Sequence, residues 1–479
     1  MNSKIEGFFK SVVYTISANV ISLLITVLTT LFLPKFLGVE DFSFWQLYLF
    51  YIGYIGLLHF GWNDGLYLRY GGKKYSELDR NLFFSQFVQL LLSQTILAVL
   101  LGLIAIVFDF EDNKRMVLLY TAVAIVIVNS RYMLLYILQS TYRMRHYSIV
   151  TIIEKLCFAF FLVSIILMEL FKYKYVILLD LSSKLISFSI AIFFCREIVV
   201  NSLAKFQFNL KETLKNINVG IKLMFSNIAS KLMIGNIRFG IEQFWSIIVF
   251  GKVSLMLSVA GFVMIFINAI SLVLFPFLRR IKEESLIRLY PYLRSSLMGV
   301  LFVFLLIYFP LKYCLNLWLP EYKIGIDLLL FLFPMCLFEG KMALLINTYL
   351  KVLRKEKLLM IVNFSSLAIS IVLSFIAVVV LHNLNLSVLT ITVVVMIRSF
   401  IAEIYLTSKM NINIYKKMLF EVSMVVIFIT SVFYLEMTMA IPVYILALIV
   451  YLLIHQSDLR AAINFIKKTL KREEDVSIS

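Results

Sequence analysis

The sequence predicts an all-α integral membrane protein with about 14 transmembrane helices. Three observations predict this class: 62% of the 479 residues are hydrophobic, the mean hydropathy is +0.95, and only 15% of the residues are charged. A water-soluble chain of this length needs far more polar surface, so lipid is the solvent that suits this composition. Long apolar runs separated by short basic segments complete the pattern.

Apolar runs of about 18 residues or more define the individual spans. Six runs precede a basic segment, six follow it, and two more close the series. The predicted spans are 12–33, 44–61, 82–108, 116–140, 147–169, 174–195, 217–248, 253–278, 295–317, 326–350, 358–381, 386–407, 418–435 and 438–455. The second span is the least regular, because it is short and rich in tyrosine and glycine.

This order predicts two pseudo-symmetric six-helix lobes followed by two C-terminal helices. The predicted boundaries are an N-terminal lobe at 1–198, a basic cytoplasmic inter-lobe segment at 199–216, a second lobe at 217–408, helices 13 and 14 at 409–456, and a tail at 457–479. In the tail, apolar residues recur on one helical face among basic residues: Leu459, Ile463, Ile466 and Leu470. We expect an amphipathic helix at the cytoplasmic surface, or simply a solvated anchor.

The basic residues predict the orientation of the chain. Counted over alternate loops, 29 lysines and arginines lie on one side and 8 on the other. Cytoplasmic loops carry the excess of positive charge, and an even number of spans places both termini on the same side. Both termini are therefore expected in the cytoplasm.

Several function classes do not suit this sequence. The net charge of +17 is divided into short clusters between apolar runs, which does not predict nucleic-acid binding. The four cysteines show no C-x-x-C spacing and the four histidines are scattered, so neither a disulfide framework nor a metal site is expected. By the predicted spans no outer loop exceeds roughly 20 residues, which leaves no room for a catalytic domain. A polymerase or lipid-linked glycosyltransferase is therefore disfavoured, and no catalytic residue is predicted.

The seventh span, SNIASKLMIGNIRFGIEQFW at 226–245, carries charges inside a membrane-like sequence. Lys231, Arg238 and Glu242 return to one narrow stripe of a helix, and Asn227 falls close to the same line. A cation near the centre of a span costs about 2.5–3.5 kcal/mol on insertion scales, so these positions require an explanation.

Two explanations of the stripe stay open at this stage. Arg238 and Glu242 are four residues apart and can neutralise each other, which would make that pair structural. Lys231 has no acid three or four residues away. Asp180 in span six is a candidate partner, although Lys184 follows it by four residues. The other explanation is that Lys231 lines a polar cavity.

Span one repeats this geometry with neutral groups. Its stripe consists of Thr15, Asn19, Ser22, Thr26 and Thr29. Such a stripe suits a hydrated ligand with hydroxyl groups, although small polar residues also pack helices together in lipid. Arg131 and Lys341 are further candidates for a cavity, whereas Arg398 lies close enough to a loop for snorkelling to explain it.

The two six-span blocks show a weak internal repeat. FLGVEDFSFWQL (37–48) after span one matches VFGKVSLMLSVA (249–260) after span seven at an offset of 213 when Gly38 is paired with Gly251. YRMRHYSIV (142–150) matches LRKEKLLMIV (353–362) at an offset of 211 when Arg143 is paired with Arg354. Two near-equal offsets that agree with the six-plus-six order indicate a duplication.

With this plan the chain resembles the bacterial polysaccharide flippases of the O-antigen and capsule type, which belong to the multidrug/oligosaccharidyl-lipid/polysaccharide exporter superfamily. The segments that carry the resemblance are LPKFLGVEDFSFWQLYL, QSTYRMRHYSIV and LVLFPFLRR. The resemblance implies two lobes around a central cavity. It also implies alternating access that moves an undecaprenyl-diphosphate-linked oligosaccharide from the inner to the outer leaflet of the bacterial cytoplasmic membrane. The short second span departs from the family pattern.

This substrate gives the charged stripe a role. A lipid diphosphate carries negative charge through hydrocarbon, and fixed cations such as Lys231 and Arg238 lower that barrier. The predicted substrate-binding residues are Lys231, Arg238, Glu242, Asn227, Asn19, Thr26 and Arg131. Membrane lipids, a polysaccharide polymerase and glycosyltransferases are the expected partners. No cofactor is expected apart from a coupling ion, H+ or Na+, which the sequence does not assign.

The alternative within the same superfamily is a multidrug or other small-molecule antiporter. Exporters of organic cations need buried carboxylates, and span one contains neither Asp nor Glu. Asp180, Glu154, Glu339 and Glu403 nevertheless lie in other spans, so the alternative stays open.

Overall fold

The computed structural model describes residues 2–202, 205–279, 283–353, 355–458 and 460–461, with the backbone alone at 2–19, 265–266, 268–277, 279, 283 and 356. Throughout these residues the regular structure is helical and no strand occurs. The chain divides into two units, Met1–Ile228 and Ala229–Ser479, with the division inside one long helix. The predicted all-α membrane fold is confirmed.

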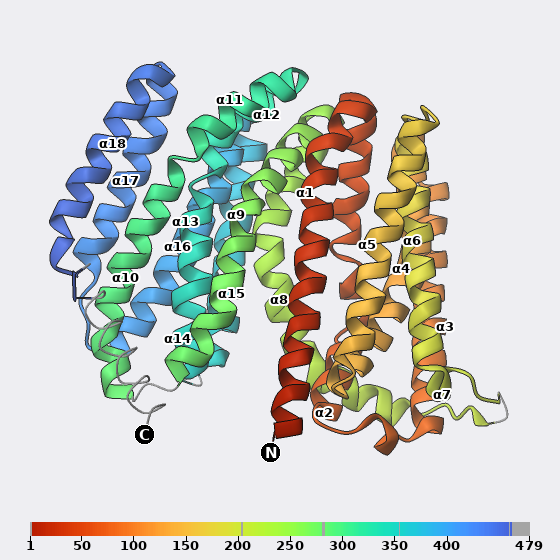
Figure 1. The fold of residues 1–479 in the computed structure, drawn as a ribbon. Helices are drawn as coiled ribbons and strands as arrows, with labels where there is room; N and C mark the ends of the chain where they lie inside the picture. The colour runs from red at the N-terminus through yellow and green to blue at the C-terminus, as the bar shows by residue number, and fades with distance from the viewer. Residues whose placement is uncertain (1, 203–204, 280–282, 354, 459, 462–479) are drawn as a thin grey trace. The chain divides into compact units, whose positions relative to one another are not determined.

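Among its described residues, unit 1 contains five long helices, the first part of a sixth and several short helices (Figure 1). They are α1 (Asn2–Ile52), the 3-10 helix η1 (Ile55–His59), α2 (Trp62–Tyr70), η2 (Tyr75–Glu77), α3 (Arg80–Val107), α4 (Asp112–Ser140), α5 (Met144–Leu167), α6 (Tyr173–Phe194), α7 (Arg196–Val199) and the first part of α8 (Leu210–Phe244).

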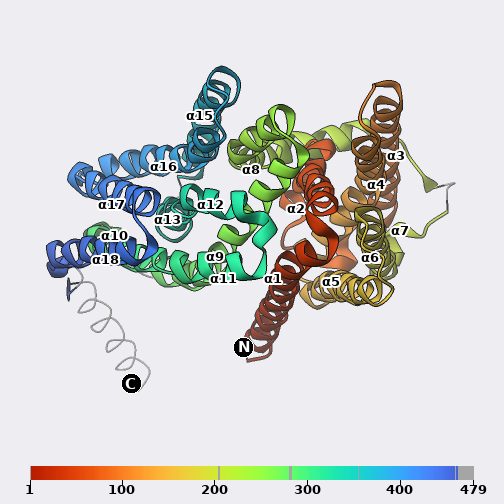
Figure 2. The same ribbon diagram turned by 90° about the horizontal axis from the view of Figure 1, so that it is seen from above.

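Unit 2 contains the rest of α8 and ten further α-helices. They are α9 (Ile247–Arg279), α10 (Glu283–Leu305), α11 (Tyr308–Trp318), α12 (Lys323–Leu332), α13 (Met335–Lys341), α14 (Asn347–Val352), α15 (Glu356–Ser374), α16 (Leu384–Lys409), α17 (Tyr415–Tyr434) and α18 (Met437–Ile454), with the short 3-10 helix η4 (Pro320–Tyr322) and the π-helices η5 (Met342–Ile346) and η6 (Phe375–Val380). Figures 1 and 2 both show α17 and α18 side by side, and Tyr444 of α18 donates a hydrogen bond to the Phe302 carbonyl of α10 at 2.9 Å.

The described residues contain 11 helices long and apolar enough to cross a membrane, or 12 if the bent pair Pro320–Leu332 and Met335–Val352 is one span. The sequence predicted about 14. One difference is that Val20–His59 is a single candidate span, whereas the sequence predicted two spans, 12–33 and 44–61, in this region. The other is that α8 does not qualify as an apolar span, because its charged and amide side chains lower its hydropathy.

The predicted second span, 44–61, is not a single regular helix. Gly38 interrupts α1 with φ 72°, and the chain then leaves η1 through two residues in the left-handed region, Phe60 and Gly61. Gly61 is required here for a second reason, since a Cβ at this position would lie 2.5 Å from the Ile221 nitrogen. The irregularity anticipated from the sequence is therefore a break that allows a close approach of two backbones.

The beginning of α8 packs tightly against α2 within unit 1. A Cβ on Gly65 would lie 1.8 Å from the carbonyl oxygen of Asn216, so only glycine permits this spacing. Next to this contact, Arg69 Nη2 lies 2.6 Å from Glu212 Oε1. Burial alone would raise the pKa of Glu212, but its hydrogen bond with Arg69 and the charge of Arg69 lower the pKa below its usual value. The first turns of α8 are thus fixed to unit 1 by both packing and charge.

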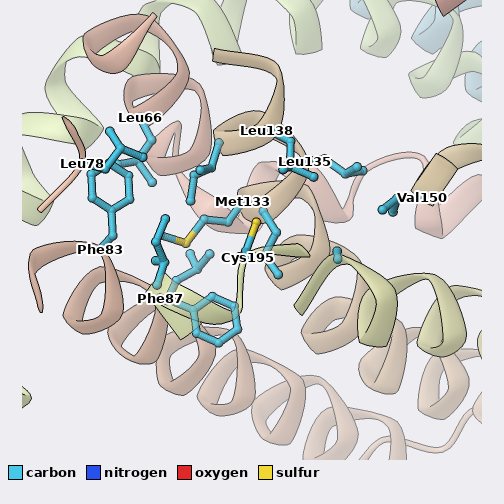
Figure 3. Packing of buried hydrophobic residues seen from close by; sticks show 14 of the residues in the cluster. Leu66, Leu78, Phe83, Phe87, Met133, Leu135, Leu138, Val150 and Cys195 are labelled. Atoms are coloured by element: carbon cyan, nitrogen blue, oxygen red, sulfur yellow. The ribbon is translucent and has the colours of Figure 1, made fainter. Parts of the chain in front are cut away.

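Each unit has a hydrophobic core, and the two cores are built at corresponding sequence positions. Figure 3 shows the core of unit 1, where side chains from α2, α3 and α4 meet around Met133. Six of its residues recur in the core of unit 2 at an offset of 211: Leu78, Leu134, Leu135, Leu138, Ala191 and Cys195 correspond to Leu289, Leu345, Ile346, Tyr349, Ala402 and Leu406. This correspondence supports the duplication inferred from the sequence.

The predicted lobe boundaries stay a prediction, since the two units meet at 228–229 inside α8. The predicted amphipathic tail, including Leu459, Ile463, Ile466 and Leu470, lies outside the described residues apart from 457–458 and 460–461.

Candidate functional site

Unit 1 contains a buried group of charged residues on four helices, which we call the N-unit cluster: Tyr48, Arg131, Glu154, Asp180 and Lys184. The Arg131 guanidinium pairs with Glu154, and Lys184 pairs with Asp180, four residues away on α6. Lys184 Nζ also lies 3.9 Å from Glu154 Oε1, and the Tyr48 hydroxyl donates to Asp180 Oδ2 at 2.8 Å. The contacts form an open chain that carries no net charge.

Unit 2 contains a second group, the C-unit cluster: Tyr290, Arg294, Lys341, Glu403 and Glu421. Lys341 Nζ lies 2.7 Å from Glu403 Oε2 and 2.8 Å from Glu421 Oε2. Arg294 lies 2.5 Å from Glu403 and 2.7 Å from Glu421, so the four charges form a closed ring. The Tyr290 hydroxyl donates to Glu403 Oε1 at 2.9 Å. All four charged side chains are 0% exposed.

Two positions read from the sequence as near-loop cations are in fact buried. Arg294 is one of the 29 basic residues assigned above to the cytoplasmic loops, but it lies inside α10 within the C-unit cluster. Snorkelling was expected for Arg398, yet its side chain is 7% exposed, with Nη1 3.1 Å from Glu339 Oε1 and Nε donating to Asn363 Oδ1 at 3.0 Å. Both expectations are wrong because acids from neighbouring helices, which the sequence does not place, compensate the cations.

The structure assigns different environments to the residues of the predicted α8 stripe. Asn227 and Lys231 are exposed, Arg238 is half-buried and Glu242 is buried. Arg238 Nη2 donates to Ser254 Oγ of α9 at 2.9 Å, and its guanidinium lies over the Phe250 ring. Glu242 accepts a hydrogen bond from its neighbour Gln243. Arg238 and Glu242 therefore pack within unit 2, whereas Lys231 is exposed.

The remaining predicted residues have separate environments. Arg131 lies in the N-unit cluster, where it also donates to Ser187 Oγ at 3.0 Å. Thr26 is exposed, and its hydroxyl donates to the Ser22 carbonyl at 2.8 Å, which leaves its oxygen as an acceptor. The side chain of Asn19, like that of Thr15, lies outside the described part of the chain.

Sequence reasoning missed the C-unit ring as a whole. It noted Lys341 and Glu403 separately, but these residues are 62 positions apart, and Lys341 and Glu421 are 80 apart. The available signal was one cation and two acids inside predicted spans, Lys341, Glu403 and Glu421, with Arg294 one residue before the span at 295–317. Because isolated charges are costly in hydrocarbon, such a balance points to mutual pairing.

The fold is similar to that of three solved membrane proteins, which are transporters and a flippase.

The lipid II flippase MurJ in an inward closed conformation matches with a TM-score of 0.63 and 12% identity, over 94% of this chain and 99% of MurJ. An inward-facing multidrug resistance MATE family transporter of the MOP superfamily matches with a TM-score of 0.59 and 12% identity, over 82% of this chain and 98% of the transporter. A variant of the MATE transporter VcmN of Vibrio cholerae matches with a TM-score of 0.54 and 12% identity, over 86% of this chain and 98% of VcmN. No protein-family model and no curated protein matches the sequence.

Proposed function

We propose that this protein is a flippase that moves undecaprenyl-diphosphate-linked oligosaccharide from the inner to the outer leaflet of the bacterial cytoplasmic membrane. The cycle is alternating access, and it serves the synthesis of a cell-surface polysaccharide such as O-antigen or capsule. One observation carries the proposal: five carboxylates in the helices of the two units lie in ion pairs with lysine or arginine, whereas the charges exposed along α8 are mainly cationic.

The acids are the first half of this observation. Each of five carboxylates in the helices of the two units lies in an ion pair with lysine or arginine: Glu154, Asp180, Glu339, Glu403 and Glu421. An exporter of organic cations needs buried carboxylates that are available to its substrate. These five are already compensated, which disfavours the multidrug antiporter.

The cations of α8 are the second half. Lys231 is exposed on this helix and Arg238 is half-buried, whereas the exposed Lys222 lies nine residues before Lys231, on the opposite face and away from this path. A lipid diphosphate that crosses hydrocarbon is stabilised by cations along its path. Lysine suits a moving anion because its ammonium is a flexible point charge, whereas arginine grips phosphate oxygens in a bidentate manner. We assign the diphosphate to Lys231 first, with Arg238, Asn227 and Glu242 completing the path.

The proposal also gives roles to the other predicted residues and partners. The acceptor oxygens of span one, Thr26 and Asn19, would meet sugar hydroxyls, and Arg131 would act through the N-unit cluster that it neutralises. Glycosyltransferases must supply the lipid-linked oligosaccharide at the inner face, and a polymerase would consume it at the outer face. The coupling ion, H+ or Na+, is not assigned to any residue.

A leaflet-resolved measurement in a gene-deletion strain tests the proposal. The lipid-linked saccharides are extracted after labelling of the outer leaflet, and the strain is complemented with the wild type, Lys231→Ala or Lys222→Ala. Lys222 is the matched control, since nine residues of helix place it on the face opposite Lys231. We expect inner-leaflet accumulation that the wild type and Lys222→Ala relieve. Loss of a charge-assisted contact predicts roughly 10- to 100-fold slower flipping for Lys231→Ala at equal protein levels.

Two results would overturn the proposal. Unchanged lipid-linked saccharides in the deletion strain, together with altered resistance to cationic drugs, would support the antiporter instead. Full flipping by Lys231→Ala and Arg238→Ala would remove α8 from the diphosphate path.

A further inference from the structure

A cavity of about 340 Å³ opens in unit 2 where several membrane helices end. It is lined by residues of α11, α12, the first turn of α16 and the last turn of α17. Candidate spans end at Trp318 and Tyr434 and begin at Leu384, all within a few residues of the cavity lining. The cavity therefore lies at the level where hydrocarbon gives way to the headgroup region.

Aromatic residues around the cavity independently indicate the same depth. Tyr313, Trp318 and Tyr434 are exposed on the helices that form it, with Tyr434 78% exposed. Tyrosine and tryptophan gather at membrane interfaces because they combine an apolar ring with a polar group. A ligand in this cavity would have its polar end at headgroup depth and its apolar end in the acyl region.

The polar part of the cavity consists of one cation, one anion and one amide. Lys312 Nζ lies 3.4 Å from Asp327 Oδ1, and Asn385 lies on the same lining. The Asp327 side chain is 53% exposed and that of Lys312 19%, so both charged groups are accessible from the rim. A ligand with one positive and one negative group can replace this single long contact with two, while the site stays neutral.

The apolar part extends from the charged pair along the helices. Ile324 and Phe433 are exposed next to the cavity, and the largely buried Phe331 lies between them and the core. Aliphatic and aromatic side chains of this kind suit an acyl chain. The cavity is too small for an oligosaccharide of several units but accommodates a phospholipid headgroup with its first methylenes.

We propose that this cavity binds a phospholipid with a zwitterionic headgroup of the phosphoethanolamine type. The phosphate lies at Lys312, the ammonium lies at Asp327, and an acyl chain follows Ile324 and Phe433. A zwitterion leaves the site without net charge, whereas an anionic lipid would face Asp327 without a compensating cation of its own. This site is separate from α8, so the inference does not depend on the proposed flippase activity.

Native mass spectrometry of the full-length protein with equal amounts of phosphatidylethanolamine and phosphatidylglycerol tests the site. For the wild type we expect retention of phosphatidylethanolamine. Asp327→Asn should weaken the binding of phosphatidylethanolamine about tenfold and shift the preference to phosphatidylglycerol, because the site then carries a net positive charge. Asp327→Glu keeps the carboxylate and should retain the preference for phosphatidylethanolamine. This result would show that substitution at position 327 does not by itself disrupt the site. Asp41→Asn removes a comparable exposed pair, Lys172–Asp41 at 3.2 Å, in unit 1 and should change nothing.

Three outcomes would overturn the inference. The first is equal binding of the two lipids to the wild type, and the second is an Asp327→Asn variant with unchanged preference. The third is displacement of phosphatidylethanolamine by a free saccharide but not by glycerophosphoethanolamine, which would make the cavity a sugar subsite.

Discussion

The two units neutralise buried charge in different ways. In the C-unit cluster two cations and two acids form a closed ring in which each carboxylate contacts both cations, and the charged side chains are 0% exposed. In the N-unit cluster the contacts run as an open chain from Arg131 to Tyr48, and the charged side chains are 4–10% exposed.

This difference indicates how rigidly the charged helices of each unit are held together. Breaking one contact of a dry ring leaves a charge without water, so α10, α13, α16 and α17 are held together. An open chain whose charged side chains are slightly exposed can exchange one partner at lower cost, because a charge that loses its partner is less completely buried than in the ring. The comparison therefore predicts that unit 2 is the more rigid of the two.

Removing one acid of the ring should have the largest effect. Glu403→Gln leaves Arg294 and Lys341 with a single carboxylate between them, and the expected loss is about 3–5 kcal/mol in the free energy of unfolding. Thermal and denaturant unfolding in detergent measures this loss, with the exposed Glu436→Gln as the matched control. The double variant Lys341→Met with Glu403→Gln restores neutrality and should recover part of it. If Glu403→Gln were as stable as the wild type, the ring would not be what holds α10, α13, α16 and α17 together.

The equivalent change in unit 1 sharpens the comparison. Glu154→Gln leaves Arg131 with Ser187, while Lys184 keeps Asp180. We expect a smaller loss of about 2–3 kcal/mol, since the remaining charge is only partly desolvated. The same unfolding experiment decides, and a loss equal to that of Glu403→Gln would remove the distinction between chain and ring.

Backbone packing is a further property of unit 1 that single substitutions can test. Gly65→Ala places a methyl group within 1.8 Å of the Asn216 carbonyl, so α2 and α8 must separate. The expected cost is about 1–3 kcal/mol. Gly102→Ala in α3 is the control, because a methyl group at that position would meet nothing within 4 Å, and alanine there should be neutral or stabilise by up to about 1 kcal/mol. Equal stability of the two variants would contradict the close approach.

The smallest effect concerns the end of α18. Lys417 Nζ lies 2.6 Å from Asp458 Oδ2, and Ser295 donates to the same oxygen at 2.7 Å. Burial alone would raise the pKa of Asp458, but these hydrogen bonds lower it below its usual value. A lowered pKa stabilises the fold at neutral pH, and this contribution disappears as pH falls through the folded-state pKa. Asp458→Asn should cost less than about 1 kcal/mol at pH 7 and nothing in acid; a constant difference across pH would contradict it.

Composition and apolar runs were sufficient to predict the membrane fold, since both depend on local sequence. The sequence predicted 44–61 as a span, and the break near Phe60 was not predicted, although the glycines and tyrosines of that segment set it apart; the internal repeat is supported by the positions of the two cores. Pairing across helices was not predictable, because Arg294 and Glu403 are 109 positions apart and a single sequence does not tell which helices adjoin. The sequence also could not predict that Lys231 is exposed while Arg238 is half-buried and bonded to Ser254. Helix geometry places both residues on one face of α8, but it does not tell which neighbouring helix each side chain contacts.

The order of charges in the ring has a consequence for how the protein is made. The ribosome completes Arg294 and Lys341 first, and Glu421 follows Lys341 by 80 residues. At about 5–20 residues per second, the second cation waits roughly 4–16 s for that acid. Glu403 is made 62 residues after Lys341, so until then α10 and α13 hold two positive charges with neither of their final partners, and isolated charges are costly in hydrocarbon.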